Sequence, residues 1–230
     1  MSIFLVMLMF IAVLAFGLLL KPREQLRPAP LDVQPRARPV IATQPGTDIP
    51  EAYRFHPCHT WAVDEGGEAV RVGLDSFAAG LFERVERIDL PALNCWIRQG
   101  QNFMTVRGDG ITVDFPSPVE GCLTEINRAV VRNPEQMSSD PYCDGWVAIL
   151  KSPCFAVDKK NLMHGCIVPH WMRTSEVILQ DICSSSPVLA QDGGTALRGI
   201  LKRVSPEVRS RVLKELFMTN PIVHEQRRGR

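Results

Sequence analysis

Histidine and cysteine side chains are the first candidates for chemistry in this chain. They gather at His56-Pro57-Cys58-His59 and at His164-x-Cys166-x-x-x-His170. Imidazole and thiolate groups bind zinc, and a thiolate also serves as a nucleophile or redox group. Successive side chains of a strand point to opposite faces, so Cys58 and His59 would not converge on one ion. The second group has no fourth ligand at a regular distance, and we predict no metal site.

A polar turn is the second candidate site. Two β-prone runs, 103–106 and 111–115, flank the tetrapeptide Arg107-Gly108-Asp109-Gly110. An Asp-Gly pair between such runs is a strong signal for a tight hairpin. We expect Gly108 and Gly110 to supply positive φ at this turn. The predicted interaction surface consists of Arg107, Gly108, Asp109 and Gly110, and we predict no catalytic residue.

The segments around this turn carry strand and helix patterns. Val70, Val72 and Leu74 recur with period two, which predicts a strand with one buried face. Asp75 is a suitable N-cap for a short helix over 76–82. Further strands are expected over 85–91, 121–127 and 147–150, and a short helix over 128–133.

Beyond residue 151 the pattern becomes helical. Asp158 is placed to cap a helix over 159–164, and Pro169 suits the first position of the next helix, which runs through Ile182. A last helix is expected to run from Ser205 as its N-cap to residue 218. Its buried stripe would consist of Val208, Val212 and Leu216.

Composition limits the classes of function. A chain of 230 residues holds one globular domain of ordinary size plus appendages. The net charge of +1 provides no field that would attract a polyanion, so we predict no nucleic-acid partner. Seven cysteines, an odd number in irregular spacing, indicate reduced thiols in a reducing compartment.

The N-terminal region predicts attachment to the cell membrane. Residues 2–20 carry no formal charge and are apolar or small, enough for a helix of about 28 Å. A cleaved signal peptide is disfavoured because the start is uncharged and no small-x-small site follows. Basic residues follow the apolar run, which places the globular part in the cytoplasm. We expect a single-pass transmembrane anchor over 1–21 and a proline-rich linker over 22–50.

Five segments, in this order along the chain, form a recognisable set: His59-Thr60-Trp61-Ala62-Val63, Gly73 to Ala78, Val85 to Pro91, Ser117-Pro118-Val119-Glu120-Gly121 and Asp140 to Trp146. Together they resemble the glycine cleavage H-protein family, a relative of lipoyl and biotinyl domains. The resemblance implies a mainly β fold, a lipoyl-domain-like barrel-sandwich hybrid with C-terminal α-helices. It also implies a set of residues that are at least partly buried: Trp61, Val72, Phe77, Leu90, Val119, Ile126 and Trp146.

The same resemblance locates a missing group. The family presents a lysine for lipoylation on its hairpin, and counting back from the Ser-Pro-Val-x-Gly segment puts that position at Gly110. No lysine lies between Lys21 and Lys151. Lipoyl attachment is an amide on a lysine amine, so the resemblance implies the scaffold without its cofactor.

Three functional hypotheses follow. The leading one is a non-lipoylated, membrane-anchored H-protein-like domain at 51–152, with a helical extension over 153–220 and a basic tail over 221–230. It would be a structural or adaptor subunit that acts through contacts with a protein partner, and not an enzyme. One alternative is an authentic glycine cleavage H-protein, which carries an aminomethyl group on lipoate. The other is a Cys/His metal- or thiol-dependent redox protein.

Overall fold

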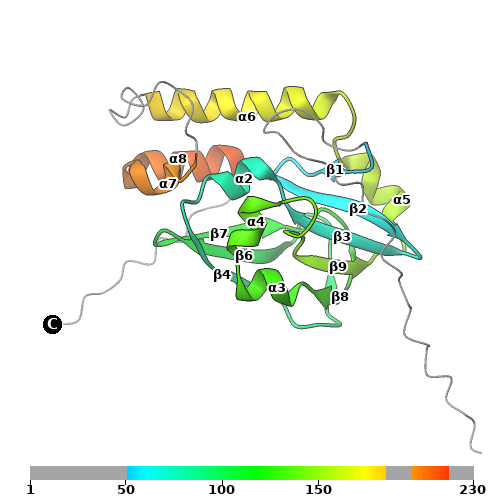
Figure 1. Ribbon diagram of the computed structural model, residues 1–230. Helices are drawn as coiled ribbons and strands as arrows, with labels where there is room; N and C mark the ends of the chain where they lie inside the picture. The colour runs from blue at the N-terminus through cyan, green and yellow to red at the C-terminus, as the bar shows by residue number, and fades with distance from the viewer. Residues whose placement is uncertain (1–50, 185–197, 218–230) are drawn as a thin grey trace, which may run out of the picture. The chain divides into compact units, whose positions relative to one another are not determined.

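Two antiparallel sheets form the body of the molecule (Figure 1). The computed structural model describes residues 51–184 and 198–217. The larger sheet has the strand order β1 (Arg54–Phe55), β2 (Thr60–Gly66), β3 (Ala69–Leu74), β9 (Ala148–Lys151), β8 (Gly121–Ile126) and β5 (Trp96–Ile97). The smaller sheet has the order β4 (Val85–Asp89), β6 (Asn102–Gly108) and β7 (Ile111–Pro116).

Helices connect the strands and continue the chain after β9. Those between strands are α2 (Ser76–Gly80), α3 (Arg128–Arg132) and α4 (Glu135–Ser139). Those after β9 are α5 (Phe155–Asp158), the 3-10 turn η1 (Lys159–Asn161), α6 (Ile167–Ser184), α7 (Ile200–Arg203) and α8 (Pro206–Phe217). The fold is therefore mainly β with helices added at its C-terminal side, as predicted.

The strand pattern of β3 and its following helix are confirmed. Val70, Val72 and Leu74 are each fully buried, as the period-two alternation requires. Asp75 caps α2, because its side chain accepts a hydrogen bond from the backbone N–H of Ala78. All seven predicted core residues are buried or half-buried, and Trp61 has no exposed surface.

Two expectations about where helices begin are wrong. Helix α6 begins at Ile167, so Pro169 is its third residue and not its first. Asp158 does not cap a helix over 159–164: it ends α5, and its buried carboxylate accepts a hydrogen bond from the N–H of Glu120 at 2.8 Å. A tertiary contact therefore uses the oxygen that the local pattern assigned to capping. The sequence also gave no indication of α4, which follows Pro134 and buries Met137 completely.

The last helix begins as predicted, with Pro206 at its first position and the hydroxyl of Ser205 accepting from the N–H of Val208 at 3.4 Å. Val212 and Leu216 are buried and Val208 is half-buried. The buried face is wider than predicted, because Leu213 and Phe217 are also buried.

Helices α6 and α8 lie next to each other on the side of the sheets where α2 lies (Figure 1). Short helix α7 joins the same region, since the N–H of Gly199 donates to the carbonyl of Gly80 at 3.0 Å. The N–H of Leu201 donates to the carbonyl of Leu81 at 3.3 Å. Helices α7 and α8 therefore share one core with α2 and the strands.

The predicted transmembrane anchor, the linker and the basic tail lie outside the described residues. Within 51–184 and 198–217, no helix has both the length and the apolar character that crossing a membrane requires.

Candidate functional site

The tip of the β6–β7 hairpin is the candidate site that the sequence singled out. Gly108 pairs with Ile111, which leaves Asp109 and Gly110 as the two residues of the turn. Their φ angles are 54° and 74°. Positive φ at both central residues is the requirement of a type I′ hairpin turn. The predicted tight hairpin is confirmed, with Asp109 in the role that was expected of Gly108.

Gly108 is needed for a different reason. A Cβ atom at this position would lie 2.3 Å from the backbone oxygen of Arg84. Strand β4 begins at Val85, which pairs with Gly108. Only a residue without a side chain allows the two backbones to approach this closely.

The carboxylate of Asp109 fixes the tip to the preceding loop. Its Oδ2 accepts a hydrogen bond from the N–H of Glu83 at 2.7 Å. The side chain of Glu83 in turn contacts Lys202 of α7, with 2.6 Å between Oε2 and Nζ. The hydrogen bond and the positive charge of Lys202 lower the pKa of Glu83. The tip is thus connected through Glu83 to the C-terminal helices.

Arg107 lies on the exposed side of β6. Its Nε is 2.9 Å from Oδ2 of Asp89 on β4, and Arg87 pairs with the other oxygen of the same carboxylate. Both arginines are largely exposed, so water screens these ion pairs and each stabilises the fold only weakly. Together they give the side of the hairpin a fixed polar surface.

Gly110 is the exposed end of the turn. No atom lies within 4 Å of the place where its Cβ would be. A side chain here would extend into open space, which is the geometry that a carrier arm needs. The residue itself has no side chain and no amine, so it offers nothing to acylate.

His59 forms a second, buried constellation far from water. Its Nδ1 is 2.7 Å from Oδ2 of Asp75, and both side chains are almost completely buried. The imidazole lies between Phe77 and Trp171, with ring centroids 4.5 and 4.4 Å away. Phe217 of α8 meets it edge-on at 5.6 Å. A ring enclosed in this way is inaccessible to substrate, and its position joins α6 and α8 to the strands.

The thiols and the remaining histidines do not assemble a reactive centre in the described part of the chain. Among residues 51–184 and 198–217, no group of three His, Cys, Asp or Glu side chains is arranged to hold a metal ion. Burial raises the pKa of the Cys58 thiol to about 11 and also raises the pKa values of Cys143 and Cys183. A nucleophilic thiol needs the opposite shift, since the thiolate is the reactive form.

The structure brings together residues that the sequence pattern did not connect. The pattern placed Arg107, Gly108, Asp109 and Gly110 at one hairpin tip; in the structure Arg107 and Gly108 end strand β6, and Asp109 and Gly110 form the turn. Glu83 and Lys202, which lie beside the tip, were not predicted to meet because they are 119 positions apart in the sequence. No local pattern could have paired them, because their contact depends on how α7 packs on the α2–β4 loop.

A hairpin presented by a small β-sandwich, with its tip open to solvent, is characteristic of carrier-type domains. The sequence profile of the glycine cleavage H-protein family matches residues 53–172 of this chain. The chain belongs to this family.

Two individual H proteins agree with this assignment by their sequences. The glycine cleavage system H protein of Prochlorococcus marinus is 32% identical over 104 residues, which are 45% of this chain and 80% of that protein. The one from Aliivibrio fischeri strain MJ11 is 36% identical over 98 residues, 43% of this chain and 78% of its own. The crystal structure of a glycine cleavage system H protein from Mycobacterium marinum is 25% identical, with a TM-score of 0.43. It covers 46% of this chain and 87% of its own.

Proposed function

We propose that this chain is a membrane-anchored, H-protein-like domain that is not lipoylated and acts as an adaptor through protein contacts. The observation that carries the proposal is Gly110. It occupies the exposed end of the hairpin turn, with open space around it, and it has no amine. The family scaffold is present, but the group that a lipoyl arm requires is absent from the tip.

The surroundings of the tip support a fixed surface rather than a swinging arm. Asp109 binds the backbone of Glu83, and Glu83 contacts Lys202 of the C-terminal helices. Arg107 is held by Asp89. A partner would meet a hairpin whose position is determined by the rest of the domain.

The anchoring part of the proposal comes from the sequence. Residues 2–20 lack charge, and the basic residues of the linker follow them. This pattern is typical of an uncleaved anchor with a cytoplasmic domain. Protease treatment of intact cells and N-terminal sequencing of the purified protein test this part. A mature chain that begins beyond residue 20 would contradict it.

Family membership favours a second candidate, a glycine cleavage H-protein that does carry lipoate. That function needs a lysine amine that a ligase can reach. Lys202 is the lysine that the structure connects to the tip, through Glu83, and its side chain is 57% exposed. The carrier hypothesis therefore has one definite place to be tested.

Intact-mass spectrometry after co-expression with a lipoate ligase separates the two candidates. We expect no lipoyl adduct on the natural chain and an adduct on a Gly110→Lys variant. Gly110→Gln is the matched control, since it introduces a side chain of similar size and the same backbone strain without an amine. An adduct on the natural chain that disappears in Lys202→Arg would replace the adaptor with a carrier.

The adaptor role itself requires a partner. The full-length chain, purified from detergent-solubilised membranes of its own host, should retain a protein in defined stoichiometry through size-exclusion chromatography. A chain that is recovered alone, at native expression and in mild detergent, would refute an adaptor function.

A further inference from the structure

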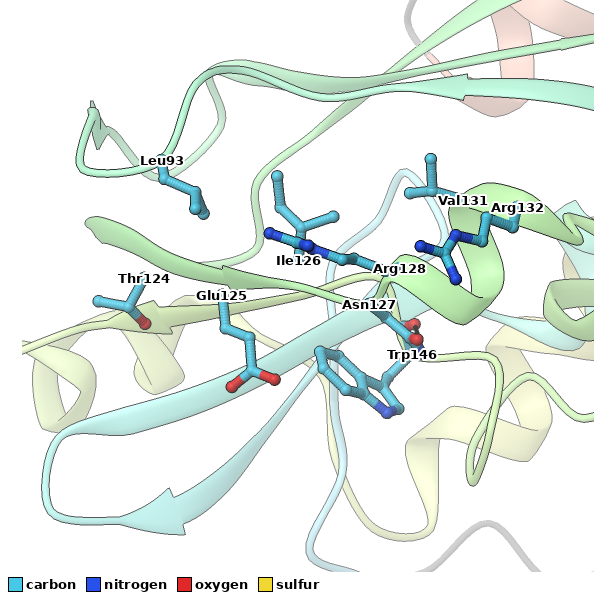
Figure 2. A pocket seen from close by; sticks show the side chains of 9 residues that line it. All are labelled: Leu93, Thr124, Glu125, Ile126, Asn127, Arg128, Val131, Arg132 and Trp146. Carbon is cyan, nitrogen blue, oxygen red and sulfur yellow. Dashed lines mark hydrogen bonds between the residues drawn. The ribbon is translucent and has the colours of Figure 1, made fainter. Parts of the chain in front are cut away.

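An open groove lies on the side of the domain where α3 follows β8 (Figure 2). Its volume is about 500 Å³. Figure 2 shows Leu93 on the loop before β5, Val131 on α3, and Trp146 below the end of β8. None of the residues that line the groove belongs to the hairpin tip.

Apolar side chains in this groove are unusually exposed. Leu93 is 45% exposed and Val131 is 39% exposed, while Ile126 and Trp146 are half-buried. Apolar groups that line one concave surface and remain in contact with water are typical of a binding site.

The groove also follows a strand edge that is only partly paired. Strand β5 covers β8 at Gly121 and Cys122 alone, and the loop before it bonds Leu123 through the N–H of Asn94 at 2.7 Å. Beyond Leu123, no strand of the described chain pairs with residues 124–126 on that side, because β8 has only β5 and β9 as neighbours. An extended peptide can add to such an edge through its backbone.

Three charged side chains line the groove, Arg128 and Arg132 on α3 and Glu125 on β8, so its lining has a net charge of +1. Arg128 and Arg132 stand one turn apart on α3 and are both exposed. In the described part of the chain, neither guanidinium group makes a hydrogen bond or an ion pair. The side chain of Asn127 holds the start of α3 in place by accepting from the N–H of Ala129.

We propose that the groove binds an extended acidic segment of a partner protein. The segment would continue the sheet along residues 124–126, insert an apolar side chain between Leu93 and Val131, and place a carboxylate on Arg128 and Arg132. This inference deepens the adaptor function proposed above by assigning a place and a chemistry to the partner.

The charge of this chain's own terminal segments disfavours them as occupants. Residues 22–50 contain four arginines against three acidic residues, and residues 218–230 contain three arginines against one glutamate. A segment with excess positive charge is repelled by the two guanidinium groups. An acidic segment of another protein complements them better than either terminal segment does.

Photo-crosslinking in the native host tests the assignment. The full-length chain would carry p-benzoylphenylalanine in place of Val131, and the crosslinked peptide would be identified by mass spectrometry. Val157, which is 60% exposed on α5, is the control position. We expect a crosslink to an acidic segment of one other protein from position 131 and not from position 157.

A charge-reversal pair then tests the arginines. The crosslinked segment would be synthesised as a labelled peptide and titrated against the full-length chain by fluorescence anisotropy. We expect Arg128→Glu with Arg132→Glu to weaken binding at least tenfold. Arg98→Glu with Arg173→Glu, two exposed arginines outside the groove, changes the net charge equally and should leave binding within twofold.

The outcomes are distinguishable. A crosslink to this chain's own residues, to a second copy, to lipid or to nucleic acid would overturn the proposal, and so would equal loss of binding in both pairs. If a partner co-purifies but position 131 gives no crosslink, the groove is not the binding site, and the adaptor function still stands. A lipoyl adduct on the natural chain would refute the adaptor function without contradicting peptide binding in the groove.

Discussion

The hairpin tip and the His59 cluster are two parts of the same domain with opposite physical character. The tip is exposed, and its interactions are a hydrogen bond from Glu83 to Asp109 and ion pairs that water screens. At the other site, the imidazole of His59 is 1% exposed and is enclosed by three aromatic rings. The rings around His59 come from α2, α6 and α8, so the C-terminal helices take part in the core there.

This difference separates what the fold needs from what the tip offers. Burial of rings such as Phe217 contributes to the free energy of unfolding, whereas the exposed tip contributes little. The family scaffold can therefore tolerate glycine at the tip without losing its structure. Substitutions at the two sites should differ in both the size and the kind of effect.

The largest expected effect is at Phe217. Replacing Phe217 by Ala removes a buried ring that packs on His59 and on Phe115, at centroid distances of 5.6 and 5.3 Å. We expect the free energy of unfolding to fall by about 3 kcal/mol, measured by urea denaturation. Lys214→Ala, on the exposed side of the same helix, is the control. A loss below 1 kcal/mol at Phe217 would mean that α8 is not part of the core.

Within the hairpin, the two glycines should respond differently. Gly108→Ala places a Cβ against the backbone oxygen of Arg84 and should cost about 2 kcal/mol. Gly110→Ala meets no atom and carries only the strain of a φ of 74°, which costs about 1 kcal/mol. Thermal unfolding of the two variants shows which one loses more stability. A larger loss of stability in Gly110→Ala would contradict the geometry of the tip.

A smaller effect is expected at Asp109. Asp109→Ala leaves the N–H of Glu83 without its acceptor and should cost about 1 kcal/mol in chemical denaturation. Asp109→Asn retains an acceptor oxygen and the tolerance for positive φ, so it should recover most of the loss. If both variants behave alike, the hydrogen bond has no measurable role.

The smallest effect concerns reactivity and leaves the stability unchanged. The raised pKa of Cys58, about 11 against an ordinary 9, reduces its thiolate at pH 8 by roughly 100-fold, in addition to its burial. Cys154 and Cys166 are exposed. Iodoacetamide should therefore label these two before Cys58, with the difference lost in denaturant. Rapid labelling of Cys58 in the folded protein would reopen the thiol hypothesis.

Local patterns were sufficient where neighbours in sequence determine the conformation. The Asp-Gly turn, the alternation of Val70, Val72 and Leu74, and the capping of α2 by Asp75 all depend on contacts within a few residues. Asp158 failed the same kind of reasoning because its carboxylate accepts a hydrogen bond from the N–H of Glu120, in the loop before β8. A cap is predictable only if no tertiary donor competes for it.

The sequence by itself determined the family, the position of the hairpin and the absence of lysine from its tip, since each depends on residue identity in a fixed order. Only the tertiary structure decided that Glu83 and Lys202 meet beside that tip and that His59 is enclosed by rings from three helices. It also decided that Leu93, Val131, Arg128 and Arg132 line one groove. These arrangements depend on how the C-terminal helices and the strand edges pack, and the periodicity of a single element does not encode such contacts between distant segments.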